Sequence, residues 1–256
     1  MFRLADGRIL ARVTTRNNQR AAESEVAVAH WLRNSGFAVD QPWPGIGVVE
    51  ANGLAVTLWM YRDGNWATTQ ELANVLTALH RIPIPDEPPL PALDTYPEMR
   101  RRLARSSVIT EAERQQLARL VDISKQKVRG PRFESAACVI HADASVGNLL
   151  RTASGSLVLF DLDGVCVGAR EWDLVVTAVY QELGWHSATE YEDFADTYGH
   201  DVRQWRGYKI LAQSQRLRMI CWLTGANGDH DGKKARELRV RLGDVLRGST
   251  YRWQPL

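Results

Sequence analysis

Cysteine, long apolar runs and targeting signals are all scarce in this 256-residue sequence. Its three cysteines, Cys138, Cys166 and Cys221, are odd in number and far apart. This spacing excludes a disulfide framework and a zinc site, and it predicts small buried thiols in a reduced protein. No apolar run approaches the ~18 residues of a membrane span, and the N-terminus lacks a basic start followed by an apolar core. These absences favour a cytoplasmic protein without a membrane partner.

An excess of charge of one sign is lacking as well. The chain carries 32 Lys and Arg against 30 Asp and Glu, a formal net charge of +2. The two signs are interspersed and no basic block occurs, so the sequence gives no indication of nucleic-acid binding. A hydrophobic content of 45% is ample for one large domain or two small ones.

The N-terminal part of the chain has the pattern of a small sheet with one helix. Apolar residues cluster on both sides of Asp6-Gly7 and of Asn52-Gly53, and each pair predicts a tight hairpin. Between the hairpins, apolar residues recur at helical spacing, with Gly36 as a stop. The expected elements are strands at 2–5, 8–13, 48–50 and 54–60 and a helix at 20–32.

From residue 64 onward the pattern is mostly helical. An amphipathic helix is expected over 69–80, with Thr68 or Thr69 as its cap, and prolines between 83 and 91 predict an extended linker. Further helices are expected at 96–104, at 111–128 behind Thr110, and over most of the chain after 171. The predicted fold class is α+β, with an N-terminal lobe at 1–63 and a larger, mostly helical lobe at 64–256.

Three polar residues stand where apolar strands end. Strand 138–140 leads to Asp143, a second short strand begins after Asn148, and strand 157–160 ends at Asp161. Transfer of a phosphoryl group to a hydroxyl needs a carboxylate to receive the hydroxyl proton and oxygen ligands to hold Mg²⁺ against the phosphates. An Asp, an amide five positions later and an Asp after a hairpin supply this set, in the order known from protein kinases.

The stretch VIHADASVGNLL…LVLFDLDGVCVGAREWDLV resembles the aminoglycoside phosphotransferase family, and the resemblance extends over nearly the whole chain. It implies a protein-kinase-like two-lobed fold and an Mg²⁺-dependent transfer from ATP or GTP to a hydroxyl group. By this resemblance Asp143 is the catalytic base, and Asn148 and Asp161 are the metal ligands. His141 supports the catalytic loop by packing, and Asp173 braces it from the start of a helix.

The same resemblance assigns nucleotide contacts in the small lobe. Arg12 takes the place of the lysine that holds the α and β phosphates, and Glu25, with Glu23 as second choice, is its partner on the following helix. Because a planar guanidinium replaces a point charge, the phosphate geometry should differ somewhat. The adenine-binding hinge falls at residues 58–64, with Met60, Tyr61 and Arg62 nearest the base. A surface Arg on an edge strand is the alternative for Arg12.

Two departures from the family pattern stand out. Ala142 replaces the glycine of H-G-D, and this change is expected to need only an ordinary backbone conformation. In addition, only eleven residues precede Arg12, and Gly7 is the only glycine before Gly36, so no glycine-rich phosphate loop is visible. The nucleotide-covering part of the lobe is therefore expected to be abbreviated.

The acceptor is indicated less directly. Residues 182–201 are acidic without Lys or Arg, which would suit a cationic acceptor, so Glu182 and Glu190 are candidate contacts together with Asp163 near the metal ligands. A solvated acidic helix face explains the same segment. We expect an aminoglycoside or a similar antibiotic or amino sugar as acceptor. Kinases of another metabolite (choline-like or homoserine-like), a protein kinase and a nucleotide-binding regulator remain open.

Overall fold

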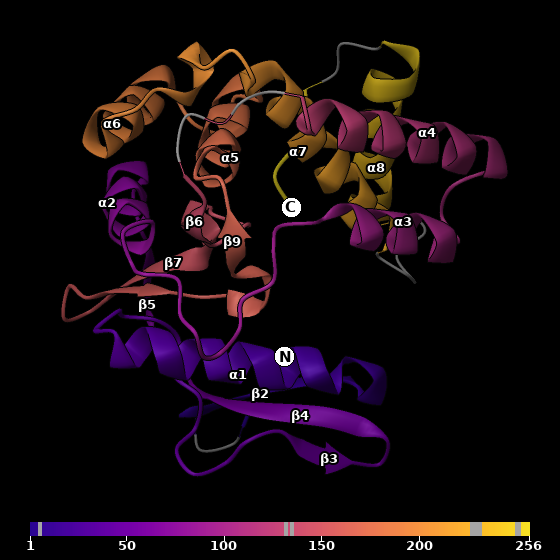
Figure 1. The fold of residues 1–256 in the computed structure, drawn as a ribbon. Coiled ribbons are helices and arrows are strands. Elements are labelled where there is room, and N and C mark those ends of the chain that lie inside the picture. Colours follow the sequence, from indigo (N-terminus) through magenta and orange to yellow (C-terminus); the bar gives the residue numbers. More distant parts are fainter. Residues whose placement is uncertain (5–6, 131–132, 134–135, 226–231, 249–251) are drawn as a thin grey trace. The chain divides into compact units, whose positions relative to one another are not determined.

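The computed structural model describes residues 1–4, 7–130, 133, 136–225, 232–248 and 252–256 (Figure 1). Two compact units are present: residues 1–92 with 137–173, and residues 93–136 with 174–256. The expected division after residue 63 stays a prediction. Within the described ranges, no helix is long and apolar enough to cross a membrane.

The first unit begins with a four-stranded antiparallel sheet in the order β1-β2-β4-β3. Its strands are β1 (Phe2–Arg3), β2 (Ile9–Thr15), β3 (Val49–Ala51) and β4 (Leu54–Met60). The strand pairings expected for both hairpins are confirmed, and residues 5 and 6 at the first turn lie outside the described part. Asn52 and Gly53 have φ angles of 51° and 74°, the left-handed pair that a two-residue turn requires.

Helix α1 (Gln19–Asn34) contacts strands β2 and β4 of this sheet (Figure 1). It buries Glu25, Val28, Ala29 and Leu32, whose spacing places them on one face. The chain leaves the helix at Gly36, where φ is 80°. The helix expected at 20–32 is thereby confirmed, with one additional residue at its N-terminal end and two at its C-terminal end.

The polar motif lies on short strands of two further sheets in the same unit. These strands are β5 (Gly64–Trp66), β7 (Leu149–Thr152) and β8 (Leu157–Leu159) in one sheet, and β6 (Cys138–Ile140) and β9 (Cys166–Gly168) in the other. The sequence did not predict β5 or β9. At Gly64 a Cβ atom would lie 2.3 Å from the Arg151 carbonyl oxygen, so only glycine allows β5 to approach β7 this closely.

Helix α2 (Thr69–Leu79) precedes the proline-rich segment and contacts β6. It starts with a capping box, in which the Thr68 hydroxyl accepts from the Glu71 amide and the Glu71 carboxylate accepts from the Thr68 amide. Glu71 also binds Arg151 of β7 at 2.8 Å. The cap predicted from the sequence therefore also links α2 to the sheet that carries the motif.

The second unit is helical in its described residues, and four of its helices share a buried core. Its elements are α3 (Tyr96–Arg105), α4 (Glu111–Val128), α6 (Ala188–Tyr198), η4 (Val202–Gln204), α7 (Tyr208–Thr224), α8 (Lys233–Arg247) and, from residue 174, α5 (Glu171–Glu182). Buried residues of α3, α4, α7 and α8 form the core, together with Trp253 of the C-terminal segment.

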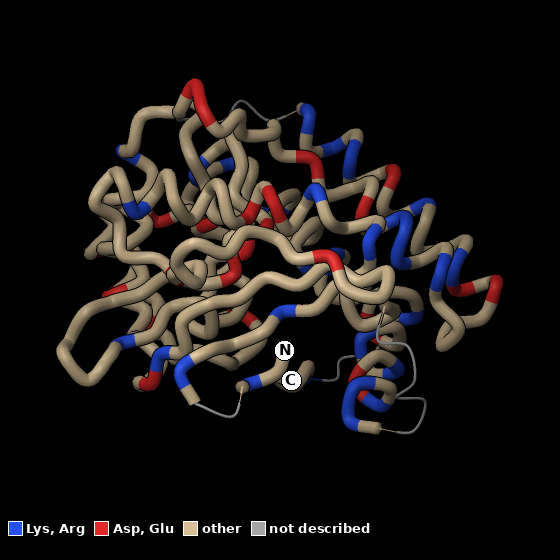
Figure 2. The backbone as a smooth tube through the Cα atoms, turned by 90° about the horizontal axis from the view of Figure 1, so that it is seen from below, with Lys and Arg blue, Asp and Glu red and all other residues tan. Residues whose placement is uncertain are grey.

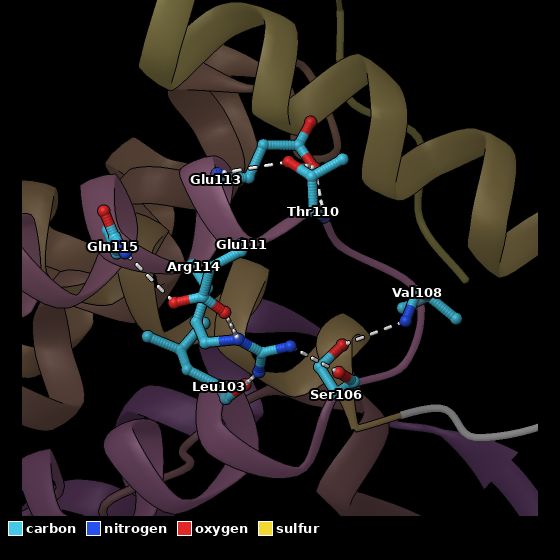
Figure 3. A network of polar contacts seen from close by, with 8 residues as sticks. All are labelled: Leu103, Ser106, Val108, Thr110, Glu111, Glu113, Arg114 and Gln115. Atoms are coloured by element: carbon cyan, nitrogen blue, oxygen red, sulfur yellow. Dashed lines mark hydrogen bonds and ion pairs between the residues drawn. The ribbon is translucent and has the colours of Figure 1, made fainter.

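The connection between α3 and α4 is held by polar contacts (Figure 3). Arg114 donates to the carbonyl oxygens of Leu103 and Ser106 and pairs with Glu111, while Thr110 forms a capping box with Glu113. Since carbonyls at a helix C-terminus otherwise lack intrahelical partners, Arg114 satisfies the end of α3 from the start of α4. Along the backbone, Lys and Arg stand among Asp and Glu (Figure 2), as the charge balance of the sequence predicts.

Candidate functional site

The buried carboxylate of Asp173, at the start of α5, organises the loop that follows β6. Its Oδ2 accepts the amide of His141 at 2.8 Å and Nε2 of His80 at 3.0 Å, and its Oδ1 accepts the amide of Ala142 at 2.8 Å. Asp173 is 0% exposed. Although burial opposes ionisation, the hydrogen bonds from His80 and from the His141 amide lower the pKa of Asp173. The carboxylate thus fixes the two residues before Asp143.

His141 connects this loop to the end of β8. Its Nε2 lies 2.7 Å from the carbonyl oxygen of Phe160 and its Nδ1 lies 3.3 Å from the amide nitrogen of Asp143. Because a carbonyl only accepts, Nε2 carries the proton and Nδ1 accepts from the amide. The neutral imidazole therefore ties the residue before Asp161 to Asp143.

The structure corrects the expectation for Ala142. Its φ angle is 64°, in the left-handed region, so the glycine of the family motif is replaced at a position that needs an unusual backbone conformation. An L-residue pays about 1–2 kcal/mol for this conformation, because Cβ approaches the following carbonyl oxygen. The residue is nevertheless buried and held, since Asp173 accepts its amide and Trp172 Nε1 donates to its carbonyl oxygen at 3.3 Å.

Asn148 and Asp161 offer oxygen atoms that suit a magnesium ion. The side-chain Nδ2 of Asn148 donates to the Asp143 carbonyl oxygen at 2.9 Å, so the side-chain Oδ1 is the atom of Asn148 that could bind a metal. The backbone carbonyl oxygen of Asn148 accepts from the Phe160 amide. Asp161 has a left-handed backbone (φ 58°) and a carboxylate that is 43% exposed. Within the described residues, no group of three or more His, Cys, Asp or Glu side chains could hold a metal. Two oxygen donors fit Mg²⁺, which keeps waters and phosphate oxygens as its other ligands.

Arg12 of β2 lies beside the Asp161 carboxylate. Its guanidinium forms an ion pair with Glu25 of α1, lies 3.8 Å from Asp161 and stands 5.6 Å from the ring centre of Trp59. Burial lowers the pKa of Arg12, but the charges of Glu25 and Asp161 outweigh burial and raise this pKa above its usual value. Burial also raises the pKa of Glu25 to about 7, with Arg12 acting in the opposite direction. The predicted pairing of Arg12 with Glu25 is present, and Glu23 instead accepts from Gln19.

Asp163 adds a third carboxylate to this cluster. Desolvation and the charge of Asp161 raise its pKa, Arg12 lowers it, and Asp143 raises it further. The turn that carries Asp163, η3 (Leu162–Gly164), contacts α1. A Cβ atom on Gly164 would lie 3.0 Å from the His141 carbonyl oxygen, so the turn passes directly against the loop before Asp143.

The predicted hinge follows β4. The amides of Met60 and Tyr61 already donate to the carbonyl oxygens of Gln41 and Arg8, both at 2.8 Å, and Arg62 binds the Gln41 side chain at 3.1 Å. A nucleotide base that hydrogen-bonds to the backbone of these residues would therefore have to use their carbonyl oxygens or the Arg62 amide.

The neighbouring Asp40 is a buried carboxyl that sequence reasoning missed. It is 5% exposed, and its amide donates to the Leu159 carbonyl oxygen at 2.9 Å. Burial raises its pKa to about 6, against the Gln41 amide and the charges of Arg12 and Arg62. In the sequence, Asp40 is a single Asp after one apolar residue, and nothing in this pattern indicates a buried carboxyl.

The acidic residues of the second unit are largely engaged in local contacts. Glu182 accepts from the Tyr208 hydroxyl at 2.7 Å and from Arg216 at 2.6 Å, and it lines a pocket of about 380 Å³ with both residues. Glu190 caps α6 by accepting the Ser187 amide, which with the Ser187 hydroxyl lowers the pKa of Glu190. These two carboxylates are thus already neutralised or used as caps.

Comparison with models of known protein families gives a match over most of the chain. A model of the phosphotransferase enzyme family (APH) matches residues 1–211. The chain belongs to this family. Membership makes the protein a phosphotransferase with an alcohol group as acceptor. A comparison with curated protein sequences found no match.

Solved structures share the kinase-like fold of this phosphotransferase. An amicoumacin kinase in complex with AMP-PNP, Ca²⁺ and Ami has a TM-score of 0.68 at 14% identity, covering 96% of this chain and 84% of that one. A choline kinase from Streptococcus pneumoniae has a TM-score of 0.66 at 13% identity, with 94% and 86% covered. A type VIII aminoglycoside-3'-phosphotransferase has a TM-score of 0.59 at 20% identity, with 81% and 86% covered. The α+β, kinase-like fold class is confirmed.

Sequence reasoning missed three residues that shape the phosphotransferase loop. His80 sits at the C-cap of α2, 93 residues before its partner Asp173, and no local pattern connects them. Trp172 is buried, and its Nε1 donates to the carbonyl oxygen of Ala142 in the loop. Gly164 follows the D-x-D sequence, where a glycine is a signal of close backbone approach.

Proposed function

We propose that the protein transfers the γ-phosphoryl group of ATP or GTP, with Mg²⁺, to a hydroxyl of a small molecule such as an aminoglycoside or a similar antibiotic or amino sugar. The observation that carries the proposal is that Arg12 pairs with Glu25 and lies 3.8 Å from Asp161, in the compact unit that also contains Asp143 and Asp163. A cytoplasmic location would supply the nucleotide.

Asp143 is the proposed catalytic base. It would accept the proton of the acceptor hydroxyl and orient that oxygen for in-line attack. The contacts of His141 and of Asn148 with the main chain of Asp143 support this role, because they fix the direction in which its side chain leaves the loop.

We assign nucleotide binding to residues 1–63, and catalysis and acceptor binding to residues 64–256. Arg12 would contact the phosphates with Glu25 as its partner, and Met60, Tyr61 and Arg62 would lie near the base. Asn148 and Asp161 would hold the metal, which when bound neutralises charge on the phosphates. The ion pair of Arg12 with Glu25 and its distance of 3.8 Å from Asp161 support this arrangement.

For the acceptor, we propose Asp163 as the principal contact, with Glu182 and Glu190 as secondary candidates. The engagement of Glu182 by Arg216 and of Glu190 by Ser187 favours a second candidate function. In this alternative the acceptor is a smaller, less cationic metabolite, of the choline or homoserine kind, for which a broad acidic surface is unnecessary.

The test is incubation with Mg²⁺ and labelled ATP or GTP and a panel of aminoglycosides, other amino sugars, choline and homoserine, analysed by mass spectrometry. Wild-type protein should phosphorylate a small molecule, and Asp143→Ala should abolish turnover while retaining most nucleotide affinity. Asp161→Ala should weaken nucleotide binding only when Mg²⁺ is present. Continued phosphoryl transfer by Asp143→Ala would contradict the assignment, and nucleotide binding without any product would favour a regulator.

A further inference from the structure

The loop before Asp143 is held at Ala142 by two consecutive residues of α5. The amide of Ala142 donates to Asp173 Oδ1 at 2.8 Å, and its carbonyl oxygen accepts from Trp172 Nε1 at 3.3 Å. Trp172 is 2% exposed and Ala142 is 5% exposed, so water does not readily replace either partner. Both peptide groups next to the Ala142 Cα atom are therefore bound by one rigid helix turn.

Such restraint is needed because Ala142 is an L-residue with φ at 64°. The left-handed conformation is disfavoured for L-residues by roughly 5- to 30-fold in population relative to the right-handed one. A glycine would have no such preference. If Ala142 relaxed, the peptide leading to Asp143 would rotate, and the hydrogen bond from the Asp143 amide to His141 Nδ1 at 3.3 Å would be lost.

We propose that Trp172 is a positioning residue for phosphoryl transfer, whose indole N–H keeps Ala142 in its left-handed conformation and thereby sets the direction of Asp143. This inference rests on the proposed role of Asp143 as base. The competing explanation is that the Trp172 N–H donates to Ala142 only because a buried indole needs some acceptor. Under the proposal, the effect of removing the Trp172 N–H depends on whether residue 142 disfavours positive φ. Under the competing explanation, the effect is the same whichever residue stands at position 142.

The experiment compares wild type, Trp172→Phe, Ala142→Gly and the double variant. Phe keeps an aromatic ring, smaller than the indole, but lacks the N–H, and glycine removes the preference against positive φ. Two quantities are measured: hydrogen exchange of the amides at 142 and 143 without any ligand, and turnover with magnesium nucleotide. Trp172→Phe should speed this exchange roughly 5-fold and lower kcat by a similar factor, with the nucleotide KM unchanged. In the Ala142→Gly background, the same substitution should change both by less than about 2-fold.

Trp253→Phe is the matched control. Trp253 is 1% exposed, and its Nε1 donates to Asp244 at 2.9 Å in the helical unit. The substitution should lower Tm but leave the exchange of residues 142 and 143 unchanged, and Ala142→Gly should not compensate for it.

Equal effects of Trp172→Phe in both backgrounds would overturn the proposal. If Trp172→Phe alone does not fold, recovery of folding by Ala142→Gly supports the inference and lack of recovery overturns it. A wild-type protein that phosphorylates nothing would refute the proposed reaction, and the positioning of Asp143 for transfer would fall with it. The ligand-free exchange would still decide whether Trp172 holds the loop.

Discussion

Replacement of Asp173 by asparagine tests how strongly the loop depends on one carboxylate. Asp173 accepts three hydrogen bonds, from His80, His141 and Ala142, and is fully buried. Hydrogen bonds to a charged group contribute about 1.5–3 kcal/mol each. Asparagine retains one acceptor oxygen, but its NH₂ group must face at least one of the N–H donors. We therefore expect the free energy of unfolding to fall by about 3–5 kcal/mol, as when one partner of a buried pair is removed.

Thermal and urea unfolding at neutral pH measure this loss, which corresponds to a Tm decrease of roughly 10 °C. The control is Asp122→Asn, which removes an exposed ion pair with Arg100 and should cost less than about 1 kcal/mol. A loss below about 1 kcal/mol for Asp173→Asn would refute the reasoning, because it would mean that the amides and His80 are satisfied without the carboxylate.

The pH dependence gives the same prediction a second, independent test. The folded protein lowers the pKa of Asp173, so its ionised form contributes stability above the unfolded pKa of about 3.9. That contribution is lost as the pH falls through the folded value. The difference between wild type and Asp173→Asn should therefore be constant from about pH 5 to 8 and should shrink below about pH 4. A difference that grows on acidification would contradict the assignment.

Two further substitutions test the cluster around Arg12 and the turn beside the loop. Burial raises the pKa of Glu25 to about 7, so wild-type stability should fall by at most about 3 kcal/mol as the pH rises from about 4.5 through 7. Glu25→Gln should abolish this slope in urea unfolding at pH 5 and 8, and an unchanged slope would exclude Glu25 as its source. Gly164→Ala should cost about 1–3 kcal/mol and lower turnover, because its Cβ would lie 3.0 Å from the His141 carbonyl oxygen. Gly47→Ala, which meets nothing within 4 Å, is the control and should leave both unchanged.

The elements that the sequence predicted have local causes. The Asn52-Gly53 turn forms because both residues tolerate positive φ, and the capping boxes behind Thr68 and Thr110 need only a Glu three residues later. The order Asp143, Asn148, Asp161 was visible for a similar reason, since each residue lies next to a short apolar strand within 25 residues of chain. Local patterns of this kind can be recognised in the sequence without knowledge of the tertiary structure.

Strands β5 and β9 and the contacts of Asp40 depend instead on residues distant in the chain. Gly64 of β5 pairs with Thr152 of β7, and the backbone amide of Asp40 donates to the Leu159 carbonyl oxygen. Strands β5 (GNW) and β9 (CVG) each contain a glycine and lack the apolar run that marks the equally short β6 and β8. A pairing partner about 90 or 120 residues away leaves no mark in the local sequence. The strands that pair with the motif strands β6 and β7 were therefore predicted less completely than the motif itself.

Ala142 shows why a departure from a motif should be judged together with its neighbours in space. The sequence alone suggested that alanine replaces glycine because the backbone there is ordinary, and this was wrong: φ is 64°. A strained residue persists only where its surroundings determine its conformation. Here Asp173 and Trp172 hold the amide and the carbonyl oxygen of Ala142. The family's late Asp supplies one of these bonds, and the residue just before it supplies the other. The replaced glycine and the adjacent tryptophan are 30 residues apart in sequence, but physically they form one feature, so a substitution at either position changes what the other must do.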